Sequence, residues 1–143
     1  MSSSRFAVAV HVLAVQAMQP DEALTSEYVA SSVNTNPVVV RRLLGLLRRA
    51  GLVRIQPGPH GGSRLTCSPA RVKLSQIYRA VEQGKLVALH RARPNPQCPV
   101  GRNIEGVLVG VLSKAERSFE RVLERTTLAD VTGALRKCVA KGA

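Results

Sequence analysis

The sequence is poor in aromatic residues and contains no long hydrophobic run. Only 3% of its 143 residues are aromatic, and tryptophan is absent. The core must therefore be built from Val, Leu, Ile and Ala, which favours helix packing, and few rings remain to stack on unpaired bases. Because no apolar run reaches the roughly 18 residues that a membrane-spanning helix requires, we expect no membrane partner.

Residues that would indicate an enzyme or a disulfide-stabilised protein are also scarce. Three cysteines are widely spaced, an odd number that suits a reducing cytoplasm better than a disulfide framework. His11, His60 and His90 have no nucleophile or acidic partner at triad-like spacing, and neither paired carboxylates nor a zinc-ligand signature occurs. We therefore expect a cytoplasmic protein that is not an enzyme and holds no metal.

The N-terminal segment admits two interpretations. Arg5 followed by FAVAVHVLAVQA loosely resembles a secretory signal with a small-residue cleavage site. The alternative is a retained amphipathic helix, in which His11 and Gln16 interrupt the apolar run. We favour the helix. Its apolar residues at helical spacing are Phe6, Ala9, Val10, Leu13, Ala14 and Ala17.

The net charge of +12 is concentrated in the middle of the chain. Residues 1–36 carry a net charge of −2, residues 37–93 a net charge of +11 and residues 94–143 a net charge of +3. Such a concentration is expected if the middle segment meets a polyanion and the two ends serve other purposes. A solvated basic face without a partner is the alternative.

The stretch LTSEYVASSVNTNPVVVRRLLGLLRRAGL predicts two short helices joined by a tight turn. Thr25 or Ser26 can cap the first helix, whose inward side is formed by Val29, Ala30 and Val33. In the turn NTNP, asparagine tolerates the required backbone geometry. This arrangement is typical of a helix-turn-helix.

The second helix begins at the turn and extends to about Ala50. Asn36 can cap it, Pro37 suits its first position, and Gly51 can end it. Val40 is expected to pack inward and Val38 to be exposed. The predicted inward face comprises Val40, Leu43, Leu44 and Leu47, and the residues away from it are Val38, Arg41, Arg42, Arg48 and Arg49.

The segments LVRIQ and SRLT around PGPHGG predict a β-hairpin. A phosphate-binding loop is the alternative, but the Lys and Ser or Thr of such a loop are missing. A hairpin after a helix-turn-helix is a wing, which would lay Arg54, Arg64 and, as a further candidate, His60 against the DNA backbone or minor groove. The residues expected to face the core are Leu52, Val53, Ile55 and Leu65.

These pieces together resemble the Rrf2 family of bacterial winged-helix transcription regulators. The resemblance rests on LTSEYVA, the helix ending in LLRRAGLV, the wing GPHGGSRL and the following VKLSQIYRAVE, while PNPQCPVGRNI and TTLADV also fit. It implies a mainly α fold with a small β-hairpin wing, and a homodimeric protein that binds double-stranded DNA, usually a repressor on a partly palindromic operator. The family often has Arg directly before the first glycine of the wing. Here Pro57 stands there, so Arg64 becomes the better candidate for the minor groove.

Candidate DNA contacts lie in the helix-turn-helix and the wing. Side chains at the turn can reach phosphates or base edges, Val38 and Val39 can touch thymine methyl groups, and Arg41 or Arg42 can reach guanine or phosphate. The predicted DNA-binding residues are Thr25, Ser26, Asn34, Thr35, Asn36, Val38, Val39, Arg41, Arg42, Arg48, Arg54, His60 and Arg64.

A long amphipathic helix is expected from Asn103 to about Thr126, or about 36 Å. This exceeds what a small winged domain needs, so we predict a dimer interface, with an intramolecular packing helix as the alternative. A final helix in TLADVTGALRKC is expected to pack on this element. The predicted interface residues are Ile104, Val107, Leu108, Val111, Leu112, Ala115, Phe119 and Val122.

The predicted organisation has three parts. Residues 1–83 form the winged helix-turn-helix DNA-binding domain, residues 84–102 a linker and possible sensor loop, and residues 103–143 the dimerisation helix and C-terminal helix. The leading function is a sequence-specific transcriptional regulator. The alternative is a non-specific nucleic-acid-binding or architectural protein, including one that acts on RNA.

Cys98 lies in the proline-rich loop PNPQCPVG of the predicted linker. Some members of the resembled family sense iron–sulfur status, nitric oxide, oxidants or cysteine metabolism through this loop. Cluster-binding members have three cysteines there, whereas this chain has one, so we expect no iron–sulfur cluster and no other cofactor. Nearby Arg91, Arg93 and Arg102 favour a reactive thiolate. Sensing of oxidants or electrophiles by Cys98 is therefore one hypothesis, beside small-molecule binding and a structural or neutral role.

Overall fold

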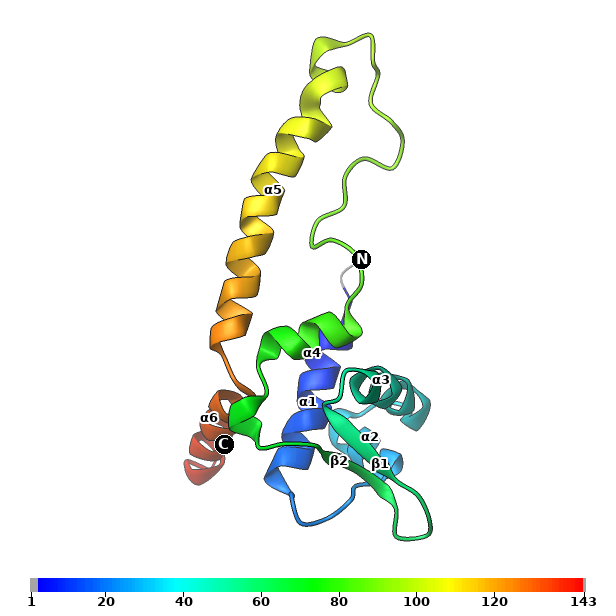
Figure 1. Ribbon diagram of the computed structural model, residues 1–143, viewed down its shortest axis with the longest axis vertical. Coiled ribbons are helices and arrows are strands. Elements are labelled where there is room, and N and C mark those ends of the chain that lie inside the picture. Colours follow the sequence, from blue (N-terminus) through cyan, green and yellow to red (C-terminus); the bar gives the residue numbers. More distant parts are fainter. Residues whose placement is uncertain (1–2, 143) are drawn as a thin grey trace. The chain divides into compact units, whose positions relative to one another are not determined.

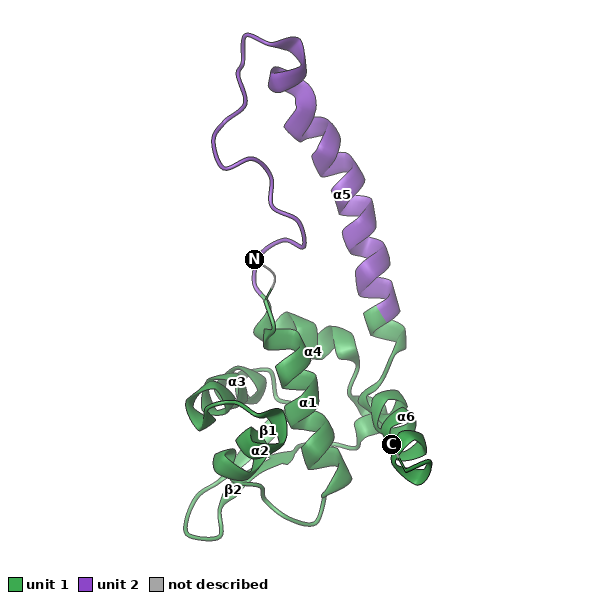
Figure 2. Cartoon of the chain, turned by 180° about the vertical axis from the view of Figure 1, so that it is seen from behind, with its two compact units in different colours: residues 1–82, 123–143 green, residues 83–122 purple. Residues whose placement is uncertain are grey.

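The computed structural model describes residues 3–142, which form two compact units (Figures 1 and 2). Unit 1 combines the chain up to Glu82 with the chain from Leu123 onward, and unit 2 comprises Gln83–Val122. The predicted mainly helical fold with one small hairpin is confirmed. The elements are α1 (Arg5–Met18), α2 (Ser26–Val33), α3 (Pro37–Arg49), β1 (Val53–Gln56), β2 (Gly62–Leu65), the 3-10 turn η1 (Pro69–Arg71), α4 (Leu74–Val81), α5 (Pro99–Arg125) and α6 (Leu128–Ala140).

Helix α1 lies at the centre of unit 1 and contacts α2, α3, α4, α6 and β2. Val12 and Leu13 are fully buried in this core. Gln16, which the sequence suggested as an interruption of the apolar face, is itself only 3% exposed. Its Nε2 donates a hydrogen bond to Ser63 Oγ at 2.6 Å, which satisfies the buried amide nitrogen and links α1 to the wing.

The helix-turn-helix forms as the local signals predict. Thr25 Oγ1 accepts a hydrogen bond from the Tyr28 amide at 3.1 Å, and Asn36 Oδ1 accepts one from the Val38 amide at 2.8 Å. Asn34, between the two helices, adopts a left-handed conformation with φ 64°. The predicted inward face of α3 is confirmed, since Val40, Leu43, Leu44 and Leu47 are buried.

Gly51 ends α3 as predicted. It has φ +77°, and its amide bonds to the Arg48 carbonyl at 2.9 Å while the Leu52 amide bonds to the Leu47 carbonyl at 3.0 Å. This pair of bonds is the Schellman motif, in which a left-handed residue satisfies carbonyls at the helix end. The motif turns the chain directly into β1.

The wing is an antiparallel hairpin in which Val53 pairs with Leu65 and Gln56 with Gly62. Strand β2 is fixed to the chain before α2, because Ser63 and Leu24 exchange backbone hydrogen bonds of 2.8 and 3.0 Å. The prediction that Ile55 faces the core is wrong, since Ile55 is 47% exposed. In β1 only the first residue, Val53, is buried, and the hairpin then extends beyond the helices.

Helix α6 packs on α1 and η1, whereas the sequence suggested packing along the preceding helix. Backbone bonds from the Leu74 amide to the Thr126 carbonyl and from the Leu128 amide to the Val72 carbonyl hold this part of the chain beside η1. The compact units therefore divide the chain at Glu82 and Val122. The predicted division into three parts was based on the roles expected of them, namely DNA binding, linking and dimerisation. These roles stay predictions.

Helix α5 begins at Pro99, four residues before the predicted start at Asn103. Proline suits a first helical position because it has no amide hydrogen to leave unpaired. The Arg102 amide bonds to the Cys98 carbonyl at 2.9 Å, while Asn103 uses its side chain to donate to the Pro99 carbonyl at 2.7 Å. Cys98 therefore stands at the start of a helix, and is not in the middle of a stiff loop.

Unit 2 leaves much of α5 accessible. Within α5 as a whole only Leu123, which belongs to unit 1, is buried. None of the helices in residues 3–142 is long and apolar enough to cross a membrane.

The two wing glycines Gly58 and Gly62 provide a test of how the hairpin is fixed. Both have positive φ, but a Cβ on Gly62 would overlap the backbone of Leu24, whereas a Cβ on Gly58 would meet nothing within 4 Å. Gly62→Ala should lower the free energy of unfolding by about 2 kcal/mol or more, and Gly58→Ala by about 1 kcal/mol. Urea denaturation measures both values. Equal losses would contradict the proposed contact with Leu24.

Candidate nucleic-acid interface

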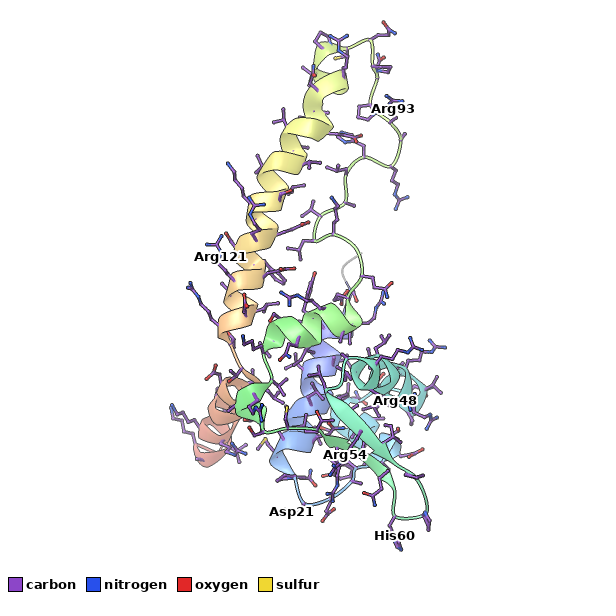
Figure 3. All side chains as sticks on the ribbon, in the orientation of Figure 1. Asp21, Arg48, Arg54, His60, Arg93 and Arg121 are labelled. Carbon is purple, nitrogen blue, oxygen red and sulfur yellow. The ribbon has the colours of Figure 1, made fainter. Side chains whose placement is uncertain are left out.

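The cationic side chains of α3 lie on its solvent face, next to the wing. Arg41, Arg42, Arg48 and Arg49 are all exposed, while the opposite face of the helix is buried. Figure 3 shows Arg48 on α3 and Arg54 on β1 on neighbouring elements of unit 1. The structure thus brings the predicted helix and wing cations onto adjacent elements.

A hollow of about 300 Å³ lies between α3, the wing and the start of α2. We call it the α3–wing hollow; it is lined by Ser26, Arg41, Leu44, Gly45, Arg48, Ile55, Gly62 and Ser63. Three predicted DNA-binding residues, Ser26, Arg41 and Arg48, therefore share one site. Sequence reasoning missed Gly45 and Ile55, because their place in this site depends on how the hairpin packs beside α3.

Arg41 is held by an ion pair across the helix-turn-helix. Its Nη1 lies 3.2 Å from Glu27 Oε1, and the two side chains are 53% and 69% exposed. Ion pairs as exposed as this contribute little to stability because water and salt screen them. An incoming anion can therefore replace the Glu27 carboxylate at low cost.

The turn and the start of α3 present several further predicted residues. Val38 is 43% and Val39 37% exposed, whereas Val40 is fully buried, as expected for Val38 and Val40. Asn34 and Asn36 are exposed and Thr35 is half-buried.

The caps of α2 and α3 engage some of these predicted side chains. Thr25 Oγ1 and Asn36 Oδ1 accept the capping hydrogen bonds, so the Asn36 amide nitrogen is the group left to donate outward.

On the wing, Arg54 and Arg64 face each other as paired residues of β1 and β2. Arg64 Nη2 donates a hydrogen bond to the Asp21 carbonyl at 2.7 Å, which engages this side chain within the protein. Sequence reasoning missed this partner because a backbone carbonyl carries no residue-specific signal. His60 is exposed at the tip of the hairpin (Figure 3). A second hollow, of about 270 Å³, lies beside both arginines and includes Gln16 and Cys67.

The predicted dimer residues of α5 fall into two groups. Leu108 and Leu112 are half-buried, and they line a hollow with the segment Val87–His90 of the same unit. Val107 and Val111, one turn apart, are 62% and 60% exposed. The remaining predicted residues are Ile104 and Phe119, which are half-buried, and Ala115 and Val122, which are exposed.

Cys98 is exposed, and its thiol is free, like those of half-buried Cys67 and exposed Cys138. Close to it in sequence, Arg93 and Arg102 line a small hollow together with Glu105, the loop residues Pro94 and Pro96, and Gly101 in the first turn of α5. A Cβ on Gly101 would lie 2.5 Å from the Asn95 carbonyl oxygen, so the helix start requires glycine at this position.

Comparison with known proteins places this geometry in one family. The model of the Rrf2 family, described as an iron-dependent transcriptional regulator, matches residues 2–134. YwnA of Bacillus subtilis (strain 168), provisionally named an HTH-type transcriptional regulator, is 44% identical over 132 residues, covering 92% of this chain and 96% of YwnA.

Two crystal structures share the fold at appreciable sequence identity. One, provisionally titled a DNA-binding protein, is 39% identical with a TM-score of 0.71, covering 90% of this chain and 98% of that one. The other, a provisionally titled transcriptional regulator from Lactobacillus plantarum, is 25% identical with a TM-score of 0.81, covering 93% and 90% of the two chains.

The described residues do not fit an iron site held within one chain. Across residues 3–142, no group of three or more His, Cys, Asp or Glu side chains is placed to hold a metal ion. An iron–sulfur cluster takes four ligands, mostly thiolates, and the loop around Cys98 supplies one. The iron in the family's description therefore has no counterpart in a ligand set among the residues that the structure describes.

Proposed function

The chain belongs to the Rrf2 family of transcriptional regulators, and from this premise we propose that it is a homodimeric, sequence-specific repressor that binds a partly palindromic DNA operator. Membership confirms the resemblance, and it confirms the prediction that the protein is not an enzyme, because the matched family consists of regulators. A regulator of this kind acts on chromosomal DNA, so the predicted cytoplasmic location is part of the same proposal.

The observation that carries the proposal is the exposed basic face of α3 beside the wing. When the protein binds DNA in the way typical of a helix-turn-helix, the start of α3 enters the major groove. There Val38 and Val39 meet thymine methyl groups, and Arg42 reaches a guanine edge. The turn residues Asn34, Thr35 and Asn36, with Thr25 and Ser26 at the start of α2, lie against the flanking phosphates. Arg54 and His60 of the wing contact the next stretch of backbone or the minor groove. Arg64, which pairs with Arg54 across the hairpin, is the third wing residue of this contact.

Competition binding separates this function from non-specific nucleic-acid binding. Genomic fragments that the protein retains should bind at least about 10³-fold more tightly than random-sequence duplex, and both should weaken with added salt. Arg42→Ala should reduce affinity for a retained fragment by about 10- to 100-fold. Arg136→Ala removes an exposed cation of α6 and should leave the affinity unchanged. Equal affinity for retained fragments, random duplex and RNA would support the architectural alternative and contradict the proposal.

The exposed apolar face of α5 supports the dimer. A large apolar side chain is normally covered when it belongs to a continuous apolar face, and contiguous exposed patches mark interaction sites. Val107 and Val111 form such a face, because residues four apart on a helix are neighbours. Leu108 and Leu112 line a hollow together with the chain's own linker, so we assign the neighbouring face with Val107 and Val111 to a second copy.

Sedimentation tests the dimer. The wild-type protein should sediment as a dimer at micromolar concentration, and the double variant Val107→Lys, Val111→Lys as a monomer, because two buried ammonium groups would oppose association. The matched control is Val139→Lys, which changes an equally exposed valine of α6, at 63%, and should leave the dimer intact. A monomeric wild type would exclude the dimer.

Cys98 is the residue through which we propose that an oxidant modulates DNA binding. Its exposure and its place at the start of the proposed dimer helix support this role. Oxidation of the thiol by hydrogen peroxide breaks the O–O bond and gives a sulfenic acid and one water, which changes the polarity and hydrogen bonding of this helix end. A small molecule bound near the same loop is the alternative effector.

Treatment with peroxide, hypochlorite or diamide provides the test. DNA affinity of the wild type should fall by about tenfold or more and recover with dithiothreitol, whereas Cys98→Ser should not respond. The variant Cys138→Ser removes another exposed thiol and should respond like the wild type. If the wild type and Cys98→Ser bind equally before and after every oxidant, thiol sensing by Cys98 is excluded.

A further inference from the structure

A glycine in the middle of α3 is not required by the packing of the chain. Gly45 has ordinary helical geometry with no positive φ, and a Cβ at this position would meet nothing within 4 Å. Glycine destabilises a helix interior relative to alanine, because it loses more backbone freedom on folding. Alanine would therefore fit here and stabilise the helix, so the open space above Gly45 is available to a partner.

The surroundings of Gly45 identify the kind of partner. Arg41 and Arg48 lie four residues before and three residues after it, so their guanidinium groups flank the glycine on the same helix face. Both arginines line the α3–wing hollow with Gly45. The large apolar residues of the lining are Leu44, which is buried, and Ile55, which is 47% exposed.

Apolar residues and two cations in one lining match a ligand chain that alternates apolar and anionic groups. A DNA strand has this chemistry, because each deoxyribose presents C–H groups and each phosphate carries a negative charge. Ser26, the first residue of α2, adds the positive end of a helix at the edge of the hollow. Glu27 is the one acidic group paired with a lining arginine in the described residues, and its exposed ion pair is readily exchanged for phosphate.

We propose that the α3–wing hollow seats a stretch of the DNA sugar–phosphate backbone, and that Gly45 lets the backbone approach α3 closely. Deoxyribose packs over Gly45 and Ile55, and the adjoining phosphates bind Arg41 and Arg48. This inference rests on the proposed DNA-binding function and goes beyond it, because it assigns a backbone site to residues that do not reach the bases. Contacts to the backbone carry no sequence information, so the site must act equally on operator and random DNA.

The experiment compares Gly45→Ala and Gly45→Gln with Gly133→Ala in the full chain. Gly133 lies inside α6, where a Cβ would also meet nothing within 4 Å, so it controls for the general effect of replacing a helix glycine. All three variants should raise the melting temperature, the alanine variants by roughly 2–8 °C. The DNA probes are a short random-sequence duplex at low salt and one fragment that the wild type retains.

Gly45→Gln should weaken binding of both probes by about tenfold or more, and Gly45→Ala by a smaller factor. The slope of log affinity against log salt should fall by about 1 to 2 for Gly45→Gln, as expected for the loss of one or two phosphate contacts. Gly133→Ala should keep the affinity and the slope of the wild type. The combination of a more stable protein with weaker binding separates a lost contact from a damaged fold.

Other outcomes overturn the inference in distinguishable ways. If folded Gly45→Gln binds random duplex as the wild type does, the hollow is not a backbone site, while the proposed function stands. A loss confined to the retained fragment would assign the hollow to base reading, and a changed sedimentation coefficient would assign it to a second copy. Should Gly45→Gln fail to fold, Gly45→Ala decides by the same criteria. A wild type that binds neither probe overturns the proposed function itself.

Discussion

The buried hydrogen bond between Gln16 Nε2 and Ser63 Oγ fixes the wing to the central helix of unit 1. The backbone bonds between Ser63 and Leu24 fix the same strand to the chain that leads into α2. A two-stranded hairpin is marginally stable in water by itself, so its position depends on these attachments. With β2 held in this way, its partner β1 lies beside α3, so the cations of the helix and of the wing lie on neighbouring elements.

The distribution of charge follows from this arrangement. The arginines of α3 occupy the face that the core does not use, and the buried face consists of Val40 and three leucines. A helix with this division is stable without neutralising its cations, since each guanidinium remains in water. The excess of basic groups in residues 37–93 therefore has little role in folding, and an anionic partner explains it. The surface of unit 2 differs from the basic surface of α3, because the exposed residues of α5 include valines as well as charged residues.

Local signals allowed the helix-turn-helix to be predicted from sequence almost residue by residue. Asn36, Pro37 and Gly51 act on their nearest neighbours, so their effects on the ends of α3 can be read without knowing the fold. The sequence also places Val38 on the exposed side and Val40 on the buried side. The basic face of the candidate site was therefore predictable as a set of positions on one helix.

Features that depend on distant segments were not predictable. Whether Ile55 is buried depends on how far the hairpin extends past the helices, and the partners of α6 depend on where the fold places α1 and η1. Arg64 bonds to a carbonyl 43 positions away, and the hollow around Gly45 exists only because the wing packs beside α3. The early start of α5 had local signals in Pro99 and Gly101, but proline and glycine favour loops as well, so the predicted helix start at Asn103 was four residues too late.

Hydroxyl-radical footprinting of the protein on a retained DNA fragment tests the central claim most directly. Two copies that each place α3 in a major groove should protect two backbone stretches related by twofold symmetry, with centres about one helical turn, or a multiple of it, apart. Each stretch should extend on one side, where the wing meets the next phosphates. Protection of one unsymmetrical stretch, or protection without a defined register on the fragment, would contradict the account.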